Sequence, residues 1–186
     1  MLPSSAPAHK GLCDSELHGH IADALTGGAS ITASFTRPND ATAYAVGDAV
    51  GAASAILTFN GLATTGSAPG RNVLITSAAL RIDVNALPAG MGAFRLHLYS
   101  GAPDVVADNA AWDLASAGDR SKYQGYLDFT APVDLGSTLW SQADSLNHQA
   151  QLADGVTALY GILQTIGAFT PTAQAVYNVT LRAVSV

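Results

Sequence analysis

The residues with the most ligand-like spacing in this chain are His18 and His20, which are separated by a single glycine. On a strand both imidazoles would share one face, and with a third ligand they could hold a divalent metal. That ligand would have to come from a distant segment, such as His97. The three histidines would suit a metal-dependent enzyme of the cupin type. An ordinary polar pair is the favoured interpretation, and no metal or cofactor is expected.

Acidic residues form a second candidate cluster. Carboxylate oxygens could coordinate calcium, but the spacing does not match an EF-hand loop. Aspartate also caps turns through its short side chain. We therefore favour turn caps over calcium ligands. The four aspartates concerned are Asp104, Asp108, Asp113 and Asp119.

Motifs for covalent or phosphate chemistry are missing from the sequence. It has no Gly-x-Ser-x-Gly elbow, no phosphate-binding loop and no dinucleotide glycine pattern. Glycoside hydrolysis needs two facing carboxylates, and the 13 aspartates permit many pairs without singling out one. We therefore expect a protein that is not an enzyme.

The segment 108–114, Asp-Asn-Ala-Ala-Trp-Asp-Leu, contains a tryptophan between two acidic residues. Trp112 either plugs the end of a β-sandwich, since an aromatic ring buries a large area, or anchors a contact between subunits. Both interpretations stay open. In the second, Trp112, Asp108 and Asn109 are candidate interface residues.

Composition indicates one compact domain that needs a partner. The chain has 186 residues, of which 48% are hydrophobic and only 12% charged, and 35 alanines and 18 glycines dominate it. Small apolar residues must then reach the surface, where a partner tends to cover them. The net charge is −6 and no basic stripe is present, which argues against direct nucleic-acid binding. No apolar run is long enough to span a membrane, and no signal peptide is visible.

The sequence predicts that the candidate residues described above are positioned mostly by β-strands. Residues 1–28 are expected to form an N-terminal arm with one short helix over 14–25, whose apolar face consists of Leu17, Ile21 and Leu25; these are further candidate interface residues. From residue 29 to 186 apolar residues alternate or form short runs between turn signals. The fold class predicted is all-β: an antiparallel β-sandwich of jelly-roll or related type. The expected strands are 30–35, 55–59, 72–84, 93–99, 126–129, 137–140, 158–164 and 177–184, with a helical turn within 105–114.

Four segments of the chain, taken in the order in which they occur, resemble a family of small structural proteins of tailed bacteriophages. The likeness covers about residues 30–186 and rests on four stretches. They are Arg37-Pro-Asn-Asp-Ala-Thr-Ala-Tyr-Ala-Val-Gly-Asp-Ala-Val-Gly51, Leu80-Arg-Ile82 with Phe94-Arg-Leu-His-Leu-Tyr99, Asp108-Asn-Ala-Ala-Trp112, and Leu159-Tyr-Gly-Ile-Leu163.

The resemblance implies a head decoration (cement) protein. Such a protein is made in the bacterial host cytoplasm, sits on the exterior of the virion head and bridges subunits of the major capsid protein. It is expected to be a homo-oligomer, and a trimer is favoured because it would suit the three-fold positions of a capsid lattice. No catalytic residue carries over.

A binding module is the alternative function. A jelly-roll domain of a tail fibre or head fibre could recognise glycans on the host surface. Aromatic side chains would then stack on sugar rings. The candidates are Trp112, Trp140, Tyr123 and Tyr126.

Overall fold

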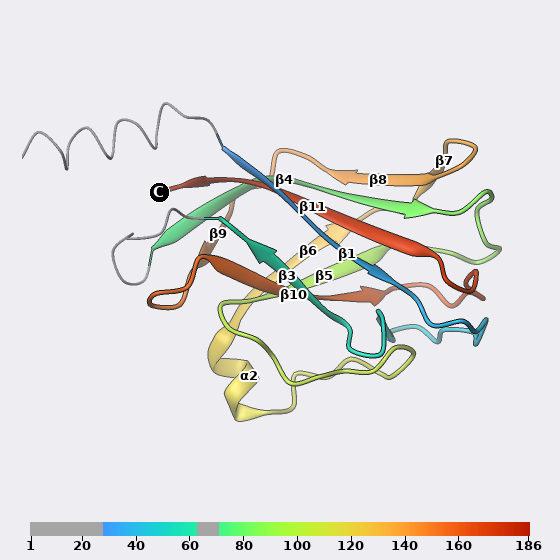
Figure 1. The fold of residues 1–186 in the computed structure, drawn as a ribbon, viewed down its shortest axis with the longest axis horizontal. Helices are drawn as coiled ribbons and strands as arrows, with labels where there is room; N and C mark the ends of the chain where they lie inside the picture. The colour runs from blue at the N-terminus through green and yellow to red at the C-terminus, as the bar shows by residue number, and fades with distance from the viewer. Residues whose placement is uncertain (1–27, 63–70) are drawn as a thin grey trace, which may run out of the picture.

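The computed structural model describes residues 28–62 and 71–186, which form two antiparallel sheets packed face to face (Figure 1). The first sheet has the order β1-β11-β4-β8-β7, and β9 also pairs with β4. The second has the order β2-β10-β5-β6, and β3 also pairs with β10. The strands are β1 (Ala29–Thr36), β2 (Ala49–Val50), β3 (Ile56–Asn60), β4 (Asn72–Asp83), β5 (Phe94–Tyr99), β6 (Tyr123–Phe129), β7 (Val133–Asp134), β8 (Leu139–Ala143), β9 (His148–Gln151), β10 (Ala158–Thr165) and β11 (Val176–Ser185).

The eight longer strands define the topology. They are β1, β3, β4, β5, β6, β8, β10 and β11. Numbered one to eight along the chain, they lie in the orders one-eight-three-six and two-seven-four-five. This is the double-sheet arrangement of a jelly roll. The predicted antiparallel sandwich of jelly-roll type is therefore confirmed.

Alternation along the strands places the core between the sheets. In β5 the side chains of Phe94, Leu96 and Leu98 are buried in the core, as the sequence pattern predicts, while Arg95 and His97 face the other way. Aromatic rings hold the middle of the core together: Tyr177 and Phe94 make an edge contact at 6.3 Å between centroids. Large core members from other strands are Phe59, Ile75, Leu80, Ile82, Phe129, Leu139, Leu159, Leu163, Val179 and Leu181.

The helical turn expected within 105–114 is misplaced. The described helix is α2 (Ala117–Lys122), which begins just beyond that segment. Its position follows from its cap, because the Ser116 hydroxyl accepts a hydrogen bond from the Asp119 backbone N–H at 2.9 Å. The sequence pattern also missed β9, whose residues are His-Gln-Ala-Gln and give no apolar signal.

Two expectations fall on residues 1–27, which lie outside the described residues. These are the helix over 14–25, with Leu17, Ile21 and Leu25, and the pair His18 and His20. In the ranges that the structure describes, no helix has the length and hydropathy needed to cross a membrane.

Gly161 lies in the middle of β10, where side chains of the neighbouring strands β3 and β5 of the same sheet come close to it. A Cβ there would come within 2.8 Å of Leu96 Cδ1 and 3.1 Å of Phe59 Cε2. We expect Gly161→Ala to lower the free energy of unfolding by about 1–3 kcal/mol, because overpacking forces buried side chains to move. Urea denaturation measures this.

The matched control is Gly118→Ala in α2, where the nearest atom to a new Cβ is Ser116 Oγ at 3.8 Å. There the substitution should stabilise the protein by up to about 1 kcal/mol, because alanine favours the helix. Equal effects at the two glycines would contradict the packing argument.

Candidate functional site

Four loops that cross between the sheets meet at one end of the sandwich. They are 37–48, 84–93, 130–138 and 166–175. Strand register places them together, since Thr36 lies opposite Val176 and Val176 lies opposite Asp83. We call this the crossover end; it lies at the right of Figure 1, beside β7.

Backbone hydrogen bonds join neighbouring loops of the crossover end. The Tyr44 N–H donates to the Phe169 carbonyl at 2.9 Å, and the Ile166 N–H donates to the Ala93 carbonyl at 2.9 Å. The Leu87 N–H donates to Asp134 Oδ2 at 3.3 Å. Each loop is thus tied to the next, and the four form one surface.

Large apolar side chains are exposed on this surface. Of the nine such side chains in the described part of the chain, five lie at the crossover end: Val46, Leu87, Val133, Leu135 and Ile166. Val46, Val133 and Leu135 are each more than 60% exposed. Exposed charge there is sparse, because Arg37 and Asp48 are buried and only Asp40 and Asp134 face solvent. This combination is typical of a surface that a protein partner covers.

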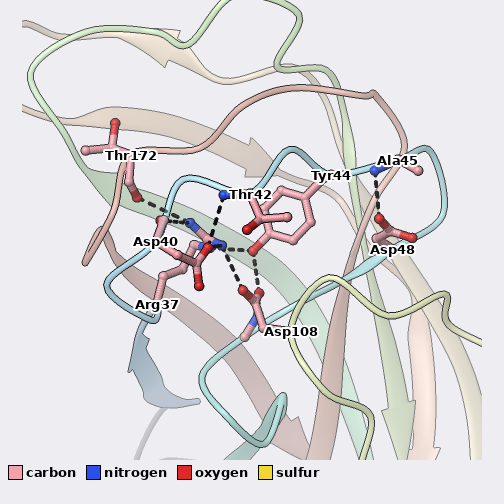
Figure 2. Close-up of polar contacts among 9 residues, drawn as sticks. Arg37, Asp40, Thr42, Tyr44, Ala45, Asp48, Asp108 and Thr172 are labelled. Carbon is pink, nitrogen blue, oxygen red and sulfur yellow. Dashed lines mark hydrogen bonds and ion pairs between the residues drawn. The ribbon is translucent and has the colours of Figure 1, made fainter.

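A buried ionic cluster lies beneath loop 37–48 (Figure 2). The Arg37 side chain is fully buried, and its Nη2 donates to Asp108 Oδ2 at 2.7 Å. Arg37 Nε donates to the Tyr44 hydroxyl, which in turn donates to Asp108 Oδ1. The Gly51 N–H also donates to Asp108 Oδ1, at 3.0 Å. We call Arg37, Tyr44 and Asp108 the buried triad.

Burial and charge act against each other within the triad. Burial alone would lower the pKa of Arg37, but the hydrogen bond and negative charge of Asp108 raise it above its ordinary value. Burial raises the pKa of Tyr44 strongly, and its hydrogen bond to Asp108 adds to this. Arg37 therefore stays charged and Tyr44 stays neutral, so the hydrogen bonds among the three side chains of the triad are kept. These bonds hold loop 37–48 against the segment that contains Asp108.

A surface hollow of ≈ 410 Å³ lies beside the triad, between Pro38, Asp40, Thr42, Ala53 and the segment 107–109. In the described residues, no buried side-chain nitrogen or oxygen lacks a hydrogen-bond partner. The walls of the hollow thus contain no buried side-chain polar atom whose hydrogen bond a ligand would have to complete.

His97 lies on the outer face of the second sheet under the segment that contains Trp112. The two rings stack with centroids 3.5 Å apart and planes at 12°. The His97 ring nitrogens lie 3.0 Å from the Tyr123 hydroxyl and 3.1 Å from Gln164 Oε1. Gln164 Nε2 donates to the Gly47 carbonyl at 3.0 Å, which links this cluster to the crossover end.

The three candidate interface residues of the described chain all make internal contacts. Asp108 belongs to the triad, and the Asn109 amide lies 3.0 Å from both the Ala43 carbonyl and Asp48 Oδ2. Trp112 covers the outer face of a sheet rather than plugging the end of the sandwich, and its Nε1 donates to the Tyr99 hydroxyl at 3.1 Å. Their interface role stays a prediction.

The remaining candidate residues, for metal binding and for glycan binding, do not lie together in one site. Among the residues that the structure describes, no group of three His, Cys, Asp or Glu side chains is placed to hold a metal. The Asp119 carboxylate accepts from the Asp104 N–H at 3.0 Å, which joins segments 15 residues apart and is not a local turn cap. Tyr123 and Tyr126 lie near His97 on the second sheet, while Trp140 lies in β8 of the first. The glycan-binding alternative stays a prediction.

Comparison with known proteins gives no family for this chain. No protein-family model matches it, and no curated protein matches it. Among solved structures it shows a weak similarity to a chain of the Israel acute paralysis virus pentamer, with a TM-score of 0.27, 12% identity, and coverage of 91% of this chain and 92% of that chain. The K3 cleaved adhesin domain of Lys-gingipain from Porphyromonas gingivalis gives a TM-score of 0.23, 10% identity, and coverage of 70% and 74%. TM-scores this low carry no argument about function.

Proposed function

We propose that the protein is a non-enzymatic head decoration protein of a tailed bacteriophage, which binds the outside of the capsid through its crossover end. The observation that carries the proposal is the set of five exposed apolar side chains on four loops tied together. The partner is the major capsid protein, as the sequence resemblance implies. The place of action is the head exterior.

Energetics favours such a surface in a repeated assembly. Burial of one Val or Leu side chain contributes about 1.5–3 kcal/mol. Much of this favourable free energy is offset by the translational and rotational entropy that is lost on binding, so a single copy is expected to bind with modest affinity. Copies that also contact each other gain avidity and hold the shell together. The jelly roll supplies a rigid support for the loops.

The test is binding of the purified chain to empty heads that lack it, measured by co-sedimentation. Val133→Asp/Leu135→Asp should weaken binding at least tenfold, because two buried apolar contacts are lost and two charges are desolvated. The matched control is Val186→Asp, which changes a side chain that is 61% exposed but lies beside Asn72, at the end of β4 away from the crossover end. It should bind like the wild type.

Two results would overturn the proposal. One is equal binding by the crossover-end variant and the control. The other is absence of this chain from the head shell in cryo-electron microscopy of virions of the phage that encodes it.

A further inference from the structure

In the part of the chain that the structure describes, no strand is hydrogen-bonded to the outer edge of β1. Among the described strands β1 pairs with β11 alone, through eight consecutive residue pairs from Ala29–Ala183 to Thr36–Val176 and without a register shift. β3 of the second sheet packs close to β1 but is hydrogen-bonded to β10. A regular edge of this kind presents a row of unpaired N–H and C=O groups that can bind another strand.

The other sheet edges are shorter or interrupted. β7 has two residues. The β2–β3 edge is broken between Val50 and Ile56, and the segment 106–109 covers its ends, because the Ala55 N–H donates to the Val106 carbonyl and the Asn109 N–H donates to the Ala49 carbonyl. On β6, a register shift near Gly125 disturbs the edge. β1 is therefore the longest regular edge among the described strands.

The sequence of β1 contains none of the usual defences against edge pairing. Natural edges are commonly blocked by charged residues, prolines or bulges. Ala-Ser-Ile-Thr-Ala-Ser-Phe-Thr has no charge and no proline. Its apolar side chains Ile31 and Phe35 are only half-buried, although both pack against the core. A neighbouring strand would cover them.

We propose that β1 pairs antiparallel with β1 of a second copy, so that the first sheets of the two copies form one continuous sheet. A two-fold axis brings the same strand to both sides of the contact. Because β1 carries no charge, self-pairing brings no like charges together. The pairing also sets Ile31 and Phe35 of both copies on one face, and Ser30, Thr32 and Ser34 on the other.

The hydroxyl face already shows this kind of contact within one chain. Thr32 Oγ1 lies 2.8 Å from Thr180 Oγ1 on β11, and cross-strand hydroxyl pairs stabilise antiparallel sheets. The second copy would extend the same row. A two-fold contact gives a dimer, in place of the trimer favoured from lattice symmetry. This inference does not rest on capsid binding.

The test begins with the mass of the purified full chain in solution, by light scattering after size exclusion. We expect twice the 18.9 kDa of one chain. Ser30→Lys/Ser34→Lys should weaken the dimer at least tenfold, because each added lysine meets another across the two-fold axis. Mixing it with Ser30→Asp/Ser34→Asp should restore a dimer containing one copy of each variant. The control Ser137→Lys/Gln149→Lys adds the same charge at exposed positions outside β1 and should remain dimeric.

Amide hydrogen exchange locates the contact. Protection of the outward-facing amides of β1 should rise with protein concentration, because pairing removes them from water. A monomer or trimer at all concentrations overturns the proposal, as does a dimer that survives the lysine pair. Protection that is independent of concentration also overturns it, because a segment of the same chain would then cover the edge. All these readouts are independent of capsid binding.

Discussion

Asp108→Ala should lower the free energy of unfolding by about 3–5 kcal/mol, because it removes the closer and more buried of the two carboxylates that pair with the buried Arg37 guanidinium and leaves only the exposed Asp40, at 3.4 Å. The Arg37 side chain has no exposed surface, and its Nη2 lies 2.7 Å from Asp108 Oδ2. The substitution also leaves the Tyr44 hydroxyl and the Gly51 N–H without their acceptor. Chemical denaturation followed by tryptophan fluorescence measures the loss.

Asp128→Ala is the matched control, because Asp128 also pairs with an arginine at 2.7 Å, but on the surface. There the loss should stay below about 1 kcal/mol, since water screens an exposed pair. A loss of the same size at both aspartates would show that burial of Arg37 has no special cost.

Acid should destabilise the protein through His97 in a defined pH window. Burial lowers the pKa of His97 from 6.5 to about 4, and the positive charge of Arg95 adds to the shift. In the unfolded chain the imidazole takes up a proton near its ordinary pKa, whereas in the folded state it stays neutral until about pH 4. The contribution to stability is therefore full above pH 6.5 and is lost as the pH falls to 4, by about 3 kcal/mol.

Denaturation of the wild type, His97→Gln and His97→Phe across that window checks this expectation. Both variants are less stable at neutral pH, since they lose hydrogen bonds or the fit against Trp112. Their stability should also fall less steeply between pH 6.5 and 4, because neither side chain titrates. Parallel curves for all three proteins would assign the acid sensitivity to carboxylates instead.

The longer strands of the jelly roll could be predicted because each packs at least one face into the core, which leaves an alternating or continuous apolar pattern. Alternation in β5, with Phe94, Leu96 and Leu98 inside, is a local pattern that needs no tertiary knowledge. β9 could not be found in this way, because only Ala150 of its four residues is buried. The helical turn was predicted at the wrong position for a different reason. The Ser116 cap fixes the start of α2, and this cap lies just after the segment 105–114 in which the turn was expected.

The candidate site was predicted only in part. Asp108, Asn109 and Trp112 were singled out from their local order, and all three do hold the segment 107–112 against the sandwich. Arg37 and Tyr44 were missed as partners of Asp108, because 71 residues separate Arg37 from Asp108 and no spacing rule spans that distance. The crossover end was missed as well, since its apolar residues come from four loops that only the topology brings together.

The pairing of β1 with β11 has a consequence for fusion proteins made with this chain. Ala29 lies opposite Ala183, so the first described residues and the C-terminus both leave the sandwich at the end away from the four crossing loops (Figure 1). In the proposed mode of capsid binding, a peptide or domain fused after Val186 would project away from the shell. Attachment and display would then use opposite ends of the fold, and a bound copy could present foreign cargo outward.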